Sequence, residues 1–145
     1  MKSFLLSKNI SAIESKSYGF TDSIDSNLSR IQMMVDAAIL SERWISEGIE
    51  PPTMECKILA KDFISKLYND FQLFPRRISA TVEEGIYVDY FNIDNERELS
   101  IEIYNDLDAA ALVTKKNKII LSIDINLDIN HDTELYKLIN AFYDR

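Results

Sequence analysis

The sequence predicts an α+β fold, in which two N-terminal helices and a C-terminal helix pack on one face of a four- to five-stranded antiparallel meander. Three observations lead to this prediction. Short stretches of alternating apolar and polar residues, joined by turn residues, fill residues 78–125. Longer stretches with apolar residues at helical spacing lie on both sides of that block. With 145 residues, the chain has the usual length of one domain.

Residues 1–22 are the least regular part of the chain. We expect them to be either a loosely ordered arm or a segment ordered by docking its Phe and Leu side chains. A first helix should begin near Asp22 or Ser23 and continue to about Glu47. Gly48 and the prolines at 51 and 52 would end it.

The first predicted helix carries two apolar lines that are rotated from one another. The first line begins at Leu28, and the second consists of Met33, Ala37, Leu40 and Trp44. A helix with two apolar lines must pack both of them against other elements. Either other elements of the same chain bury both lines, or the line of Met33, Leu40 and Trp44 meets another chain.

A second helix should run from about Thr53, which can cap it, to Phe71, and a third from about residue 132 to residue 143. Cys56 lies in the second helix, where we expect a small buried hydrophobic residue. The predicted core line of the second helix is Ile58, Leu59, Phe63, Leu67 and Phe71. The apolar face predicted for the last helix is Leu135, Leu138, Ile139 and Phe142.

Five strands are predicted near residues 78–84, 86–92, 98–104, 109–115 and 118–125. Because side chains alternate between the faces of a strand, one face of the sheet is almost wholly aliphatic, and it includes Ile119 and Leu121. The opposite face mixes aromatic, hydroxyl and carboxylate side chains, as a half-solvated antiparallel sheet does. The candidate binding residues on that face are Tyr87, Asp89, Phe91, Glu102, Tyr104 and Asp124.

Charge restricts the class of partner. The net charge is −8, and residues 76–145 hold 8 basic and 14 acidic side chains. This surplus disfavours direct nucleic-acid binding, which needs Lys and Arg for the phosphates, and favours a protein partner with a basic surface. No apolar run reaches the length of about 20 residues that a membrane helix requires. A single cysteine and the absence of a signal-peptide core lead us to expect a cytoplasmic protein.

Residues that would carry chemistry are sparse. The chain has three glycines, too few for a phosphate-binding Gly-rich loop, and one histidine, His131, with no accompanying catalytic motif. We therefore expect no cofactor and no enzyme activity. The alternative is a small metal-dependent hydrolase that uses the carboxylates Asp89, Glu102 and Asp124.

One part of the chain has a weak family resemblance. Three segments carry the resemblance, in this order along the chain: Leu73-Phe74-Pro75, Glu84-Gly85-Ile86-Tyr87-Val88-Asp89-Tyr90 and Glu98-Leu99-Ser100-Ile101-Glu102-Ile103. Over about residues 55–125 the chain resembles small bacterial proteins of the antitoxin-like or mobile-element accessory type. These proteins usually have two glycines and a tryptophan where this chain has Glu84-Gly85 and Tyr90. The resemblance implies a binding role and supplies no catalytic residues.

The sequence thus favours a non-enzymatic, acidic protein-binding module. It would be a bacterial or phage antitoxin, immunity or accessory protein that binds and occludes a partner. Besides the hydrolase, a nucleic-acid mimic that blocks a basic DNA- or RNA-binding enzyme is an alternative. A homodimer formed through the line that contains Trp44 is compatible with each hypothesis.

Overall fold

The computed structural model describes residues 15–127 and 133–145, and it confirms the α+β class with a five-stranded antiparallel sheet. The strand order is β1-β2-β3-β4-β5, so each strand pairs with its neighbours in sequence, as a meander requires. The helices are α1 (Ser15–Asp36), α2 (Glu42–Ser46), α3 (Met54–Phe71) and α4 (Thr133–Tyr143). The strands are β1 (Arg77–Thr81), β2 (Gly85–Asn92), β3 (Arg97–Tyr104), β4 (Ala109–Lys115) and β5 (Lys118–Ile125).

The tight connection between β1 and β2 sets the register of the first hairpin. Thr81 pairs with Gly85 across a three-residue loop, whose last residue, Glu84, has a left-handed φ of 68°. Gly85 then passes close to β3. A Cβ atom there would overlap the carbonyl oxygen of Ile103 and lie 2.8 Å from the Cα of Tyr104. The absence of a side chain at this position therefore lets β2 and β3 come together.

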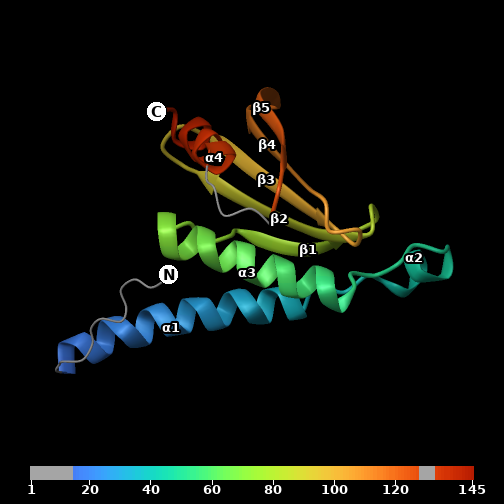
Figure 1. Cartoon of the computed structure of the whole chain (residues 1–145), viewed down its shortest axis with the longest axis horizontal. Helices are drawn as coiled ribbons and strands as arrows, with labels where there is room; N and C mark the ends of the chain where they lie inside the picture. Colours follow the sequence, from blue (N-terminus) through green and yellow to red (C-terminus); the bar gives the residue numbers. More distant parts are fainter. Residues whose placement is uncertain (1–14, 128–132) are drawn as a thin grey trace.

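The inner face of the sheet forms the core together with three of the helices. Aliphatic side chains of β2, β3 and β4 alternate into one buried cluster, which also contains the buried residues of α1, α3 and α4. α3 lies between α1 and the sheet, and α4 contacts β3, β4 and β5 (Figure 1). Leu135, Leu138, Ile139 and Phe142 are the buried residues of α4, which confirms the predicted face.

Polar side chains fix the helices at their ends. The hydroxyl of Thr53 accepts a hydrogen bond from the backbone N–H of Cys56, which confirms Thr53 as the cap of α3. At the other end of the sheet, Asn95 and Arg97 donate to the carbonyl oxygens of Phe142 and Ala141 at distances of 3.0 and 2.6 Å. These bonds satisfy carbonyl groups that the last turn of α4 leaves open.

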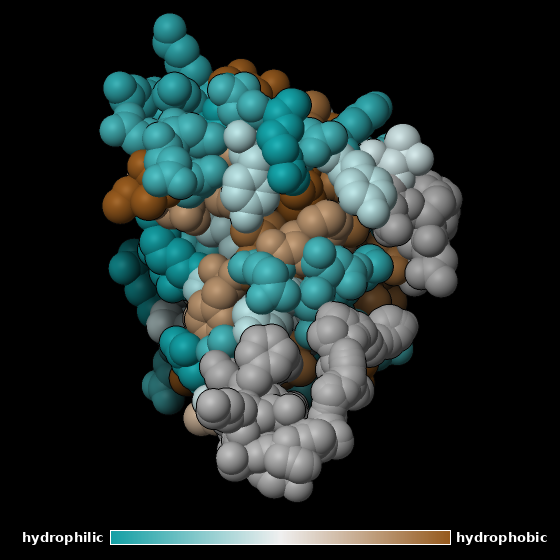
Figure 2. Space-filling view, turned by 90° about the vertical axis from the view of Figure 1, so that its left-hand side faces the viewer, coloured by the Kyte–Doolittle hydropathy of each residue, from teal (hydrophilic) through white to brown (hydrophobic). Residues whose placement is uncertain are grey.

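The surface is mixed at the end of the molecule that lies on the left in Figure 1. There the space-filling view shows hydrophobic surface between bands of hydrophilic side chains (Figure 2). Among the residues that the structure describes, no helix combines the length and the hydropathy of a membrane span.

The prediction of one N-terminal helix from about residue 22 to about residue 47 is wrong. α1 already begins at Ser15, so residues 15–22 are helical rather than a loose arm, while residues 1–14 lie outside the described part. α1 ends at Asp36, and α2 is a separate helix of five residues. Between them, Ala38 and Leu40 are buried and Ile39 is 76% exposed. This alternation shows that core packing has replaced helical spacing.

Two further side chains differ from the predicted pattern. Ile58, which we placed in the core line of α3, is 52% exposed, because α3 is rotated so that Cys56, Ala60 and Ile64 face the core. Ile119 is 67% exposed. A β-bulge at Val113/Thr114 pairs Ile119 with Thr114 and so moves it from the predicted inner face to the outer face.

Candidate functional site

The outer face of the sheet, defined as the face away from α1, α3 and α4, collects most of the predicted binding residues. The register places Tyr87 opposite Glu102, Glu102 opposite Ala110, and Ala110 opposite Asp124, so these side chains form one row across four strands. Tyr104 pairs with Gly85 and lies beside this row. The predicted convergence of Tyr87, Glu102, Tyr104 and Asp124 on one face is therefore observed.

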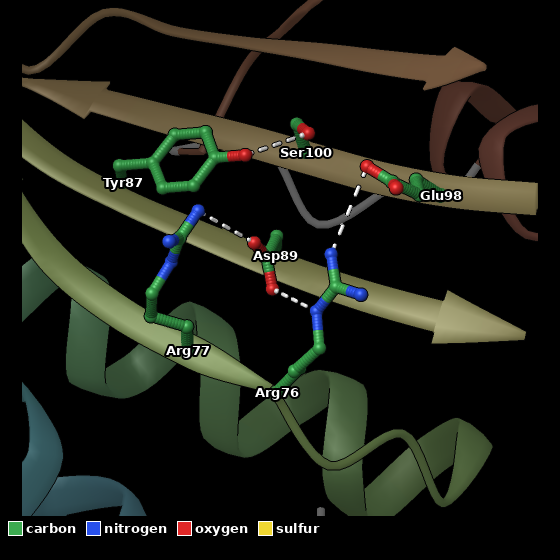
Figure 3. A network of polar contacts seen from close by, with 6 residues as sticks. All are labelled: Arg76, Arg77, Tyr87, Asp89, Glu98 and Ser100. Atoms are coloured by element: carbon green, nitrogen blue, oxygen red, sulfur yellow. Dashed lines mark hydrogen bonds and ion pairs between the residues drawn. The ribbon is translucent and has the colours of Figure 1, made fainter. Parts of the chain in front are cut away.

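Asp89, another candidate binding residue, lies on the same face, but its carboxylate is buried. It is 1% exposed, and its carboxylate lies between two arginines (Figure 3). Arg76 Nε donates to Asp89 Oδ1 at 3.0 Å, and an Arg77 terminal nitrogen donates to Oδ2 at 3.1 Å. The hydrogen bond with Asp89 is the main cause that raises the pKa of Arg76 above its usual value. Both carboxylate oxygens are thus occupied within the chain.

Aromatic rings complete this arginine clamp, which we define as Arg76, Arg77 and Asp89. The guanidinium of Arg76 lies 5.3 Å from the ring centroid of Phe91, and that of Arg77 lies 5.5 Å from the centroid of Tyr87. These are cation–π distances. Phe91 and Tyr87 therefore already have cationic partners, and their availability to a second protein is smaller than the sequence suggested.

The acidic end of the outer face, defined as Glu102, Tyr104, Asp106, Asp108 and Asp124, has a different character. All its residues except Glu102 line a cavity of about 450 Å³, together with Ala109, Ala110 and Ile125. Asp106, Asp108 and Asp124 are exposed. Their carboxylates have no ion pair within the described residues, in contrast to Asp89.

One short hydrogen bond organises the acidic end. The hydroxyl of Tyr104 donates to Glu102 Oε1 at 2.6 Å. This bond is the main cause that raises the pKa of Tyr104 to about 12, with burial and the charge of Glu102 adding to it. Tyr104 therefore stays protonated at neutral pH, and it lines the cavity beside the carboxylates.

Basic residues of the sheet gather at the opposite end. Arg97 is the only Lys or Arg in residues 78–114, and residues 119–127 contain none. Lys115, Lys116 and Lys118 surround the β4–β5 turn, whereas Ala109 and Ile125 mark the acidic end of the same two strands. The outer face is therefore polarised along its strands. Its negative end has no compensating cation of the sheet beside it.

The side-chain amide of Asn105 connects the acidic end to the segment before α3. Asn105 accepts a hydrogen bond from the backbone N–H of Thr53 at 2.9 Å and donates to the carbonyl oxygen of Pro51 at 3.0 Å. The backbone N–H of Glu50 donates to the carboxylate of Glu84 at 3.0 Å. The segment before α3 is thus held to the β3–β4 turn, which carries Asp106 and Asp108, and to the β1–β2 loop.

The predicted helical line of Met33, Leu40 and Trp44 does not exist as one surface. Met33 is 64% exposed on α1, Leu40 is buried in the connection after α1, and Trp44 is half-buried on α2. α2 buries none of its residues and projects from the end of the molecule at which α1 ends (Figure 1). The break at Asp36 is what separates the three side chains.

The described residues contain no group of three or more His, Cys, Asp or Glu side chains arranged to hold a metal ion. Asp89, Glu102 and Asp124 in particular do not converge, since Asp89 pairs with Ser100 in a different row. Cys56 is buried, as predicted, and burial raises the pKa of its thiol. His131 lies outside the described residues.

Sequence reasoning missed the arginine clamp, although a signal for it was present. A hairpin that pairs Thr81 with Gly85 necessarily pairs Arg77 with Asp89, because both positions are four residues from the turn. Opposite charges directly across an antiparallel pair attract one another. The neighbouring Arg76 adds the second cation.

Comparisons with protein-family models, with curated proteins and with solved structures found no match to this chain.

Proposed function

We propose that this protein is a non-enzymatic binding module that attaches through the acidic end of its outer sheet face to a basic surface of a partner protein. One observation carries the proposal. Three exposed carboxylates, which have no ion pair among the residues that the structure describes, line a cavity with the protonated Tyr104, at an end of the sheet that has no Lys or Arg. Unpaired carboxylates around an aromatic ring suit a lysine or arginine side chain, by ion pairing and cation–π contact.

The mechanism would be occlusion of the partner's basic site, as in a cytoplasmic antitoxin, immunity or accessory protein of bacterial or phage type. Rim charges would steer the encounter and make it salt-dependent. A nucleic-acid mimic would present carboxylates along the whole face. Here Glu102 and Asp124 lie toward one end, whereas Glu98 toward the other end is paired with Arg76, and the arginine clamp and the lysines of the β4–β5 turn occupy other parts of the sheet. The simple binding module is therefore the better fit.

The test compares two variants with the same loss of charge. Asp108→Asn/Asp124→Asn removes two charges from the acidic end, and Asp62→Asn/Asp94→Asn removes two exposed charges from α3 and the β2–β3 loop. Tagged proteins are expressed in the native cells, and bound proteins are quantified after washing at low and at high salt. We expect a stoichiometric partner to be lost with the first variant and retained with the second. Equal retention by both variants would refute the proposal.

A further inference from the structure

The outer face has an apolar part beside the acidic end. Leu112 lies on β4, and Ile119 and Ile120 are 67% and 42% exposed at the beginning of β5. We define these three residues as the apolar strip. Ile119 pairs with Thr114, and Asp124 pairs with Ala110. Thr114 and Ala110 are four residues apart on β4. Apolar and acidic surface therefore follow one another along the same two strands.

From this arrangement we infer that the partner segment is an amphipathic helix, with apolar side chains toward one end and Lys or Arg toward the other. The inference rests on the proposed function, because it names the part of the partner that the acidic end receives. Backbone groups within the sheet are already paired, so an occupant of this face must use its side chains. A helix about 10 Å wide covers the width of about two strand spacings.

Charge complementarity gives the direction of the helix. Its basic end would lie on Asp108 and Asp124, whose carboxylates have no ion pair within the described residues, and its apolar end on the apolar strip. Four strand residues span about 13 Å at about 3.3 Å each, which corresponds to about nine residues of helix at about 1.5 Å each. The basic side chains should therefore be separated from the apolar anchors by about nine positions along the helix. Placing the helix the other way round on the sheet would bring its Lys or Arg near Lys116 and Lys118.

The experiment uses two synthetic helical peptides of equal composition and about five turns in length. In the first, leucines on one helical face precede a lysine cluster by about nine residues, and in the second the lysines are spread evenly. Affinities for the full chain are measured by fluorescence anisotropy, and the contacted residues are mapped by NMR chemical shifts. We expect the first peptide to bind at least about tenfold more tightly than the second. Its shifts should cover both the apolar strip and the acidic end.

Variants separate this inference from the proposed function. Ile119→Ser should remove most of the difference between the two peptides, and Leu112→Asn gives a second test at the half-buried position. Ile45→Ser on α2 is the matched control and should change nothing. Equal affinities that both fall in Asp108→Asn/Asp124→Asn would overturn the helix but leave the acidic binding surface standing. Absence of binding, or an apolar strip covered by a second copy of the chain in solution, would also overturn the helix.

Discussion

Replacing the two arginines that contact Asp89 tests the described geometry of the outer face, because that geometry decides how much the free energy of unfolding falls. Asp89 is 1% exposed, and each of its oxygens accepts a bond from a different arginine, at 3.0 and 3.1 Å. When one arginine is replaced by alanine, the other still neutralises the carboxylate. When both are replaced, the carboxylate loses both of its cationic partners. The two losses should therefore be strongly non-additive.

The magnitudes follow from burial. Arg76 and Arg77 have side chains that are 47% and 63% exposed, so each single variant should lower the free energy of unfolding by only about 1 kcal/mol. An unpaired buried charge costs about 3–5 kcal/mol. Loss of both arginines lets some water reach Asp89, so we expect about 3 kcal/mol for the double variant. The excess over additivity is then about 1 kcal/mol.

Urea denaturation of the four proteins of this double-mutant cycle measures how far the loss of stability in the double variant exceeds the sum of the two single losses. A control cycle replaces Arg43 and Lys116, whose ion pairs with Glu47 and Glu96 are exposed. It should be additive, with each replacement costing less than about 1 kcal/mol. If the Arg76 and Arg77 effects also add within about 0.5 kcal/mol, Asp89 is not held as described.

Further predictions concern single side chains. Tyr90→Phe should stabilise the protein by about 1 kcal/mol, because the buried Tyr90 hydroxyl has no hydrogen-bond partner in the described part of the chain; a loss of stability in denaturation would contradict this. Gly85→Ala should destabilise by at least about 2 kcal/mol, since a Cβ there overlaps the backbone of Ile103; an unchanged midpoint would show that the strands can shift. Tyr104 should ionise near pH 12 in an ultraviolet absorbance titration, and Glu102→Gln should lower this pKa. Because the pKa of Tyr104 is raised on folding, its contribution to stability is present below about pH 10 and is lost as the pH rises toward 12. A Tyr104 that ionises at its ordinary pKa would show that the bond to Glu102 does not persist in solution.

The sheet could be predicted from the sequence because local rules decide it. The predicted limits of β4 and β5 agree with the structure, since short turns in a meander leave little freedom of register. The row of Tyr87, Glu102 and Asp124 follows from simple alternation. These features depend on residues that are neighbours along the chain or across one turn.

Other features depend on contacts that alternation and helical spacing do not encode. The apolar residues after Asp36 could continue the helical pattern, but the burial of Ala38 and Leu40 on either side of the exposed Ile39 ends it there. The bulge that exposes Ile119 depends on how β5 pairs with β4. Asp89 was predicted on the correct face, but its burial depends on two long arginine side chains whose direction the pattern does not give.

Zero-length carbodiimide cross-linking of the protein to its captured partner tests the central claim most directly. The reagent joins carboxylates to lysines that are in contact, and peptide mass spectrometry then identifies both residues. We expect the cross-links to fall on Asp106, Asp108 and Asp124, which line the cavity and have no ion pair with any described residue. Cross-links confined to carboxylates outside the acidic end, such as Asp62 on α3, would contradict the account of the outer face as the binding surface.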